Sequence, residues 1–152
     1  MTNIGETFPS QPYEEIVRVA ADDLDERRHV NNLVYVRWVQ QIAVAHWHAL
    51  APQEDRASFA WVVLRQEIDY VHPAFLDDEI VLRTWVGTAS GLSFERHTEI
   101  RRRGDDRILA RARTLWCPVD AQTGRPRRVR PEVRRLFSKS SAESPERVDR
   151  GQ

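Results

Sequence analysis

The longest apolar pattern in the chain predicts one buried helix, from about Asn32 to Leu50. At 100° per residue, polar side chains gather on one narrow stripe, formed by Arg37, Gln40, Gln41 and His48. Apolar side chains occupy the rest of the circumference: Leu33, Val34, Tyr35, Trp38, Val39, Ile42, Ala45 and Trp47. Because a helix that is apolar on most sides is normally buried, other elements must wrap around it. Pro52 is expected to end it.

Shorter runs of β-prone residues, alternating in places between apolar and polar, predict five strands. The first lies ahead of the helix, at Tyr13–Ala20, and four follow it, at Phe59–Val71, Glu79–Thr88, Leu92–Arg103 and Arg107–Val119. Turn-forming residues separate these runs. Along the second strand, charged side chains are expected on the face opposite Leu64, Ile68 and Tyr70. Strands with one apolar face are typical of an antiparallel sheet that covers a core on one side.

The order of these elements predicts a single α+β domain over residues 13–137, with a long antiparallel five-stranded sheet curled around one buried central helix. Residues 1–12 are expected to form an extended lead-in, and Pro131–Phe137 a short amphipathic segment. The polar tail, residues 138–152, has no periodicity and is expected to be disordered. A long sheet leaves its edge strands unpaired, so we expect a second copy to cover one edge, in a homodimer or homotetramer.

Charge and composition narrow the choice of partners and compartment. The 152 residues carry 23 basic and 23 acidic side chains, which argues against a nucleic-acid binder or a protein that binds anionic membranes. The single cysteine, Cys117, has no internal disulfide partner, and no secretory signal or membrane span is visible. We therefore expect a soluble cytoplasmic protein. The histidines have no metal-ligand spacing, so no metal site is expected.

A polar loop from Asp23 to Asn32 gathers carboxylates, a histidine and two amides directly before the predicted helix. The unpaired N–H groups at a helix start carry partial positive charge and can stabilise an oxyanion. Asp25 is the candidate catalytic group, because a carboxylate can attack a thioester carbonyl or take a proton from the attacking water. The alternative is an aspartate that only caps a loop turn.

The other polar residues of this loop also have two interpretations each. His29 is a candidate to orient water, hold Asp25 or bind the thioester oxygen, and otherwise to bond to the backbone at the helix start. Asn31 and Asn32 are N-cap candidates, with any oxyanion contact coming from the backbone. Such a loop has the parts needed to hydrolyse an ester or thioester.

The pattern Asp-x-Asp-x-x-x-His-Val-Asn-Asn, ahead of a helix with Tyr35 and Trp38, resembles the hot-dog-fold thioesterases. Most similar are the 4-hydroxybenzoyl-CoA thioesterase-like acyl-CoA hydrolases and the acyl-ACP thioesterases. The resemblance covers residues 13–137. It implies hydrolysis of an acyl-CoA or acyl carrier protein thioester, in lipid metabolism and without a bound cofactor. It also implies that Asp25 is the catalytic aspartate and that the N–H near Asn32 forms the oxyanion hole.

The chain departs from the family pattern at four positions. Arg28 stands where many relatives have glycine, and Arg27 stands where acyl-ACP thioesterases usually have asparagine. Gln40 and Gln41 stand where relatives often have glutamate, so the helix-borne catalytic carboxylate of some branches is absent. These differences leave the substrate open.

The resemblance also extends the candidate site beyond Asp25, His29 and Asn32. Substrate contacts are expected from Asn31, Tyr35, Trp38 and Glu67, although Glu67 also has the interpretation of a surface ion pair. Two other functions stay open. One is a hot-dog hydratase or dehydratase that acts on an enoyl or hydroxyacyl thioester. The other is a non-catalytic acyl-thioester binding module, which a salt bridge from Arg27 or Arg28 to Asp25 would favour.

Overall fold

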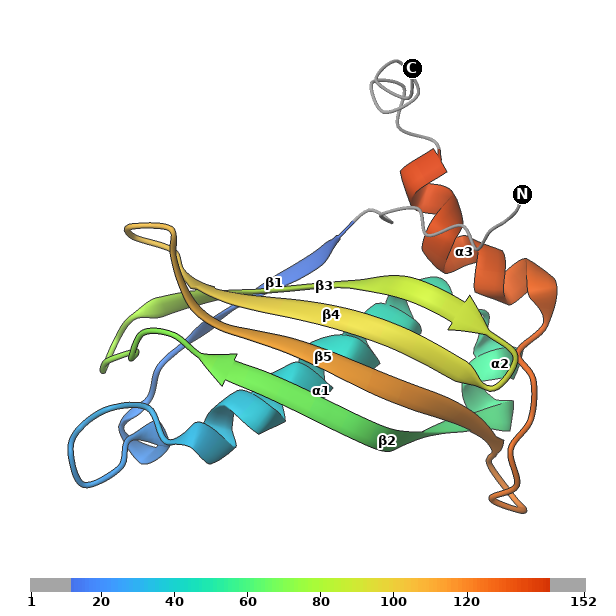
Figure 1. The fold of residues 1–152 in the computed structure, drawn as a ribbon, viewed down its shortest axis with the longest axis horizontal. Helices are drawn as coiled ribbons and strands as arrows, with labels where there is room; N and C mark the ends of the chain where they lie inside the picture. The colour runs from blue at the N-terminus through green and yellow to red at the C-terminus, as the bar shows by residue number, and fades with distance from the viewer. Residues whose placement is uncertain (1–11, 143–152) are drawn as a thin grey trace.

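A computed structural model describes residues 12–142 and confirms the predicted fold class (Figure 1). In chain order the elements are β1 (Tyr13–Arg18), the 3₁₀ helix η1 (Ala21–Asp23), α1 (Asn32–Leu50), α2 (Gln53–Ser58), β2 (Phe59–Tyr70), β3 (Glu79–Ser90), β4 (Ser93–Arg102), β5 (Arg107–Asp120) and α3 (Pro131–Ala142). The five strands form one sheet in the order β1-β3-β4-β5-β2, and all neighbours are antiparallel. The two edge strands are therefore β1 and β2.

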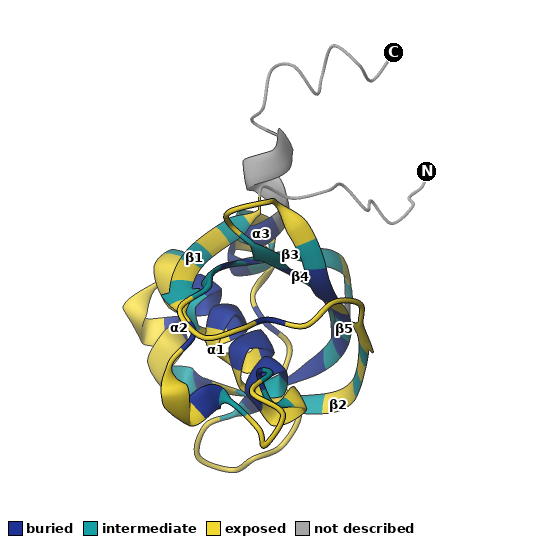
Figure 2. Cartoon of the chain, turned by 90° about the vertical axis from the view of Figure 1, so that its left-hand side faces the viewer, coloured by how far each residue is buried: buried dark blue, intermediate teal, exposed yellow. Residues whose placement is uncertain are grey.

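The sheet curls around α1, which runs along its concave face (Figures 1 and 2). The helix has the predicted bounds because its start is capped locally: the Asn31 side-chain oxygen accepts a hydrogen bond from the Leu33 N–H at 2.9 Å. Its sheet-facing side is buried, with Val39 and Ile42 wholly inaccessible. The predicted polar stripe is exposed, but Leu33, expected in the core, is 74% exposed on the same stripe. That expectation was wrong.

A β-bulge in β2 overturns part of the predicted alternation. Val63 pairs with Trp116 and Arg65 with Leu115, so Leu64 is the extra residue on this strand. Leu64 is 59% exposed and does not lie on the core face as predicted. Trp61 and Val63 before the bulge, and Ile68 after it, pack toward the core.

Two apolar clusters fill the space between α1 and the sheet. One surrounds the N-terminal half of the helix and includes Trp38, and the other surrounds its C-terminal half and includes Trp47. Buried polar residues lie on the core face between them: His46, Thr84, Arg96, Thr98 and Thr114. Such groups are stable in a core only with hydrogen-bond partners. Arg96 donates to Thr84, and Thr114 donates to the Gln66 side chain.

The C-terminal elements differ from the prediction. The short helix α2 was not predicted, and α3 extends from Pro131 to Ala142 because Val133 and Phe137 pack into the second apolar cluster. The sequence led us to expect disorder from residue 138, whereas the last residues of α3, 138–142, are described as helical. The rest of that tail and residues 1–11 of the expected lead-in lie outside the described residues.

Candidate active site

The loop before α1 is a short closed turn fixed by backbone hydrogen bonds. The Asp25 N–H donates to the His29 carbonyl at 2.8 Å, and Leu24 and Val30 form a bridge at its base. The Val30 N–H donates to the Ala74 carbonyl at 3.0 Å, which ties the loop to the segment between β2 and β3. Both ends of the turn are therefore held, and its side chains are presented at the start of the helix.

Asp25 is exposed at this turn and also shapes it. Its Oδ1 accepts hydrogen bonds from the N–H groups of Arg27, at 2.8 Å, and His29, at 3.2 Å. The loop-capping role anticipated from the sequence is thus present. Both contacts use Oδ1, and the carboxylate has a second oxygen, Oδ2, on its other side.

Asp23, the other acid of the motif, has a structural role. It is buried, and its Oδ2 accepts a hydrogen bond from the Ala20 N–H at 2.9 Å. Its Oδ1 pairs with Arg37 on α1 at 3.0 Å. This ion pair fixes the turn against the helix, so Asp25 is the acid of the pair that faces solvent.

The start of α1 supplies a backbone donor beside Asp25. Asn31 is the N-cap and Asn32 is the first helical residue. Within residues 12–142, the Asn32 N–H has no acceptor among the backbone and side-chain hydrogen bonds. It is an unpaired donor at the positive end of a 19-residue helix, which is the arrangement that stabilises an oxyanion.

Asp25 and Asn32 line one pocket of about 450 Å³, together with Arg27, His29, Val30, Asn31, Tyr35, Tyr70, Val71, His72 and Pro73. The His29 ring packs edge-on against Phe75 at 5.2 Å and makes no hydrogen bond to the Asp25 carboxylate in the described part of the chain. Tyr35 packs edge-on against Tyr70 at 5.5 Å. Burial raises the pKa of Tyr35, so its hydroxyl stays a donor at neutral pH.

Two predicted substrate contacts lie elsewhere. Trp38 is 2% exposed in the first apolar cluster and reaches the pocket only through its contact with Tyr35. Glu67 lies on the exposed face of β2, pairing with Arg65 at 3.0 Å and Arg113 at 3.7 Å. Glu67 therefore forms surface ion pairs, which is the second of the two interpretations that its sequence position allowed.

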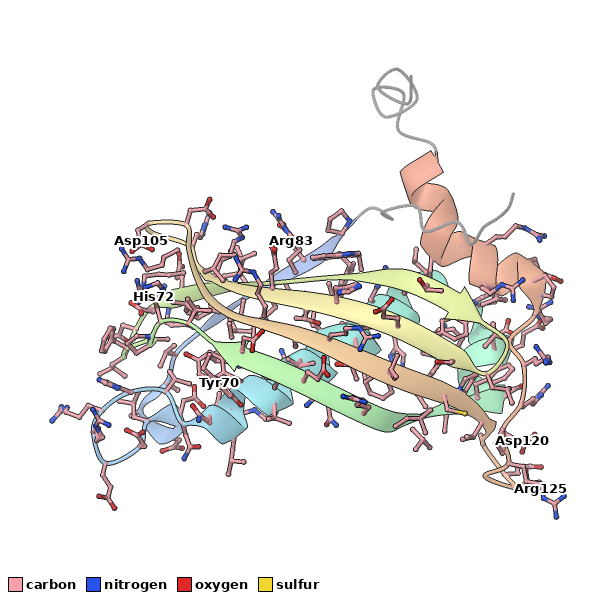
Figure 3. All side chains as sticks on the ribbon, viewed as in Figure 1. Tyr70, His72, Arg83, Asp105, Asp120 and Arg125 are labelled. Atoms are coloured by element: carbon pink, nitrogen blue, oxygen red, sulfur yellow. The ribbon has the colours of Figure 1, made fainter. Side chains whose placement is uncertain are left out.

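Tyr70 and His72 were missed as pocket residues. Tyr70 is the last residue of β2 and His72 follows it, where the end of the strand lies beside the loop that precedes α1 (Figure 3). The His72 Nδ1 lies 3.1 Å from the Ile108 carbonyl, which orients its ring. In the sequence the His72-Pro73 pair predicts only a turn. Their place in the pocket follows from sheet topology, which no local signal contains.

Arg28 has a left-handed backbone conformation, with φ of 67°. This region favours glycine, which explains why relatives are expected to have glycine there. We predict that Arg28→Gly raises the free energy of unfolding by about 0.5–1 kcal/mol, because relief of the side-chain clash exceeds the entropy cost of glycine. Urea unfolding measures the difference. Arg27→Gly, at an ordinary φ, is the matched control and should lower stability; equal loss in both variants would contradict the explanation.

No group of three or more histidine, cysteine, aspartate or glutamate residues in the described part of the chain is arranged to hold a metal ion. Among residues 12–142 there is also no helix of the length and apolar character that crosses a membrane. The polar groups that line this pocket include the Asp25 carboxylate, the start of the helix at Asn32 and the rings of His29 and His72.

Comparisons with known proteins find solved structures with a similar fold. The chain is similar to a 1,4-dihydroxy-2-naphthoyl-CoA thioesterase from Synechocystis, with 17% identity and a TM-score of 0.71 over 84% of this chain and 96% of that one. It is similar to the probable thioesterase YbaW from Escherichia coli, with 22% identity and a TM-score of 0.69 over 84% and 98% of the two chains. A Staphylococcus aureus protein in complex with CoA has 9% identity and a TM-score of 0.79 over 92% and 90%.

At these identities the structural likeness establishes the fold. No curated protein sequence was found to match the chain. The model of the thioesterase-like superfamily matches residues 19–137, a segment that includes the Asp25 loop, all of α1 and the strands β2 to β5. The chain therefore belongs to the thioesterase-like superfamily, which confirms the predicted class of enzyme, a thioester hydrolase.

Proposed function

We propose that this protein hydrolyses an acyl-CoA thioester in the pocket at the start of α1, with Asp25 as nucleophile or general base. The observation that carries the proposal is that an exposed carboxylate, Asp25, and an unpaired backbone donor, the Asn32 N–H, line the same pocket. Hydrolysis of a thioester needs both: a group that attacks or activates water, and a donor for the charge that develops on the carbonyl oxygen.

In the general-base route, Asp25 takes a proton from a water that adds to the thioester carbonyl. The carbonyl oxygen becomes an oxyanion, which accepts a hydrogen bond from the Asn32 N–H at the positive end of the helix. The intermediate collapses, the carbon–sulfur bond breaks, and the CoA thiolate takes the proton from Asp25. In the nucleophile route, the carboxylate itself attacks and expels the thiolate, and water then hydrolyses the anhydride.

The other candidate residues act by position. The backbone of His29 holds Asp25, because its N–H donates to Oδ1, while its ring forms a wall of the pocket. Asn31 caps the helix and so aligns the Asn32 N–H. Tyr35 is buried beneath the pocket and forms part of its wall from the first turn of the helix.

CoA is the favoured carrier, and acyl carrier protein is the alternative. One similar structure is described as a CoA thioester hydrolase and another contains CoA.

The proposal includes a place in acyl-thioester metabolism in the cytoplasm. The one cysteine, Cys117, is a free buried thiol, which is compatible with a reducing compartment. The binding-module alternative loses its support, because among residues 12–142 neither Arg27 nor Arg28 forms an ion pair with Asp25.

We also infer a homodimer joined along β2. A homotetramer would contain the same β2 contact together with others. The outer edge of this 12-residue strand has no partner among residues 12–142, and Val62 and Leu64 expose 46% and 59% of their surface. Two-fold antiparallel pairing of β2 with its copy brings the Phe59 end of one strand beside the Tyr70 end of the other. The Asp25 pocket would then be completed by the partner subunit.

The dimer predicts a specific effect of charge at the bulge. Leu64→Glu should convert the protein to a monomer, because two carboxylates would face each other across the two-fold axis without water. Light scattering after gel filtration measures the mass. Leu92→Glu, at an exposed leucine beyond the end of β3, is the matched control and should stay dimeric. A dimeric Leu64→Glu protein would exclude pairing along β2.

The function itself is tested by thiol release from a panel of acyl-CoAs, followed with a chromogenic thiol reagent. Release with at least one acyl-CoA is the expected result. If none is hydrolysed, the same panel on acyl carrier protein decides whether the carrier is a protein. Failure with both carriers would overturn the proposal. Loss of enoyl-CoA absorbance without thiol release would then favour the hydratase.

A further inference from the structure

A second pocket, also of about 450 Å³, lies at the other end of α1 from Asp25, between the C-terminal half of the helix and the sheet. Six large aromatic side chains belong to its walls: Trp47, Phe59, Trp61, Phe94, Trp116 and Phe137. The rings pack against one another, with Trp47 and Trp61 centred 5.2 Å apart and Trp61 and Phe94 5.0 Å apart. The aromatic walls are therefore preformed by core packing.

Arg96 is a buried positive charge in the wall of this pocket. Strand alternation in β4 puts it on the core face, where it is 7% exposed. Its Nη1 lies 2.9 Å from the His46 Nδ1 and donates to the Thr84 hydroxyl at 3.1 Å. Within the described residues, no carboxylate lies within ion-pair distance of Arg96, although many of the other arginines have one. A buried cation without an anion is costly to a fold.

The neighbours of Arg96 satisfy hydrogen bonds but do not balance its charge. Burial and the adjacent guanidinium lower the pKa of His46 to about 3, so this ring is neutral at physiological pH and accepts through Nδ1. Burial lowers the pKa of Arg96 only to about 10, so the guanidinium keeps its proton. Both contacts use Nη1, which leaves the Nε–Nη2 edge as the fork that suits a carboxylate.

The rest of the pocket is also rich in donors and free of acids. Arg56 of α2 lies at its exposed rim, and no aspartate or glutamate belongs to its lining. Among residues 12–142, the buried indole N–H groups of Trp61 and Trp116 have no acceptor. Aromatic walls with two arginines and unpaired donors suit a flat apolar ligand that carries a negative charge.

We propose that this pocket binds the acyl group of the substrate, and that this group is an aromatic acyl unit bearing a carboxylate that pairs with Arg96. The assignment to an acyl group rests on the proposed function. The β2 pairing brings the Phe59 end of one subunit, which lines this pocket, beside the Tyr70 end of its partner, which lines the partner's Asp25 pocket. A carboxylate matches the single buried guanidinium in charge and shape. A phosphate would bring close to two negative charges against one buried cation.

The test compares two flat probes of nearly equal size, 2-naphthoate and 2-naphthamide, by isothermal titration calorimetry. Wild-type protein should bind the acid at least about tenfold more tightly than the amide, because only the acid forms a charge-assisted bidentate pair. Arg96→Met should remove this preference. Arg111→Met, at an exposed arginine on the outer face of β5, is the matched control and should retain it.

The wild-type comparison needs no variant, so it decides the proposal even if Arg96→Met does not fold. Equal affinity for the two probes, or binding of neither, would overturn it, as would a preference that survives in folded Arg96→Met. Binding should persist in Asp25→Asn, which separates this pocket from the proposed chemistry. Hydrolysis of acyl-CoAs without preference for the acid probe leaves the proposed function standing and removes this inference.

Discussion

Asp25→Asn should reduce thioester hydrolysis by a factor of about 10²–10⁴ or more while leaving the fold intact. Asparagine keeps a side-chain oxygen where the Arg27 and His29 N–H groups donate to Oδ1, so the closed turn should persist. It loses the charge needed to attack a carbonyl or accept a proton from water. The measurement is kcat for thiol release with the best acyl-CoA of the panel, beside circular dichroism and the mass in solution.

Asp22→Asn is the matched control, because Asp22 is an exposed acid in η1 only three positions away and does not line the pocket. It should keep full activity. An active Asp25→Asn enzyme would contradict the mechanism and leave Asp25 as a turn cap. Multiple turnovers in oxygen-18 water test the nucleophile route: label in the Asp25 carboxylate shows that water attacked the aspartyl carbon of an anhydride, an intermediate that a general base never forms.

Local signals in the sequence were sufficient to predict α1. The Asn31 cap and the spacing of apolar residues depend only on near neighbours, and both termini of the helix are where they were expected. For the loop before α1, such local signals are not sufficient to assign a role to each residue. Local pattern alone does not separate Asp23 from Asp25, and the resemblance to the thioesterases is what favoured Asp25. The physical difference is the ion pair of Asp23 with Arg37, fourteen residues away, which makes Asp23 a buried structural acid and leaves Asp25 exposed.

The features that the sequence did not predict depend on distant partners. The bulge at Leu64 is a register shift between β2 and β5, and the pattern of β2 read alone puts this leucine in the core. His72 joins the Asp25 pocket because the end of β2 lies next to the loop before α1. Arg96 has the pattern of an ordinary strand arginine until the fold places it opposite His46.

The buried His46 predicts that the protein loses stability in mild acid. Its pKa is about 3 in the fold and near 6.5 in the unfolded chain, because burial and Arg96 oppose a second positive charge. Below pH 6.5 the unfolded chain therefore binds more protons, and the free energy of unfolding falls as the pH drops from 6.5 towards 3. By about pH 5 this single group should cost about 2 kcal/mol relative to neutral pH. Urea unfolding at the two pH values measures the loss.

His46→Gln keeps an oxygen that accepts from Arg96 but does not titrate, so this variant should lose that share of the pH dependence. His48→Gln is the matched control, since His48 is an exposed histidine on the same helix. Equal slopes for wild type and His46→Gln would show that His46 takes a proton inside the fold. Arg96 would then lie beside a second buried cation, and the electrostatic cost of leaving the aromatic pocket without an anion would be greater. If only His46→Gln weakens the dependence of the free energy of unfolding on pH, the His46 ring is neutral in the wild-type fold. Arg96 is then the one unbalanced positive charge beside that pocket.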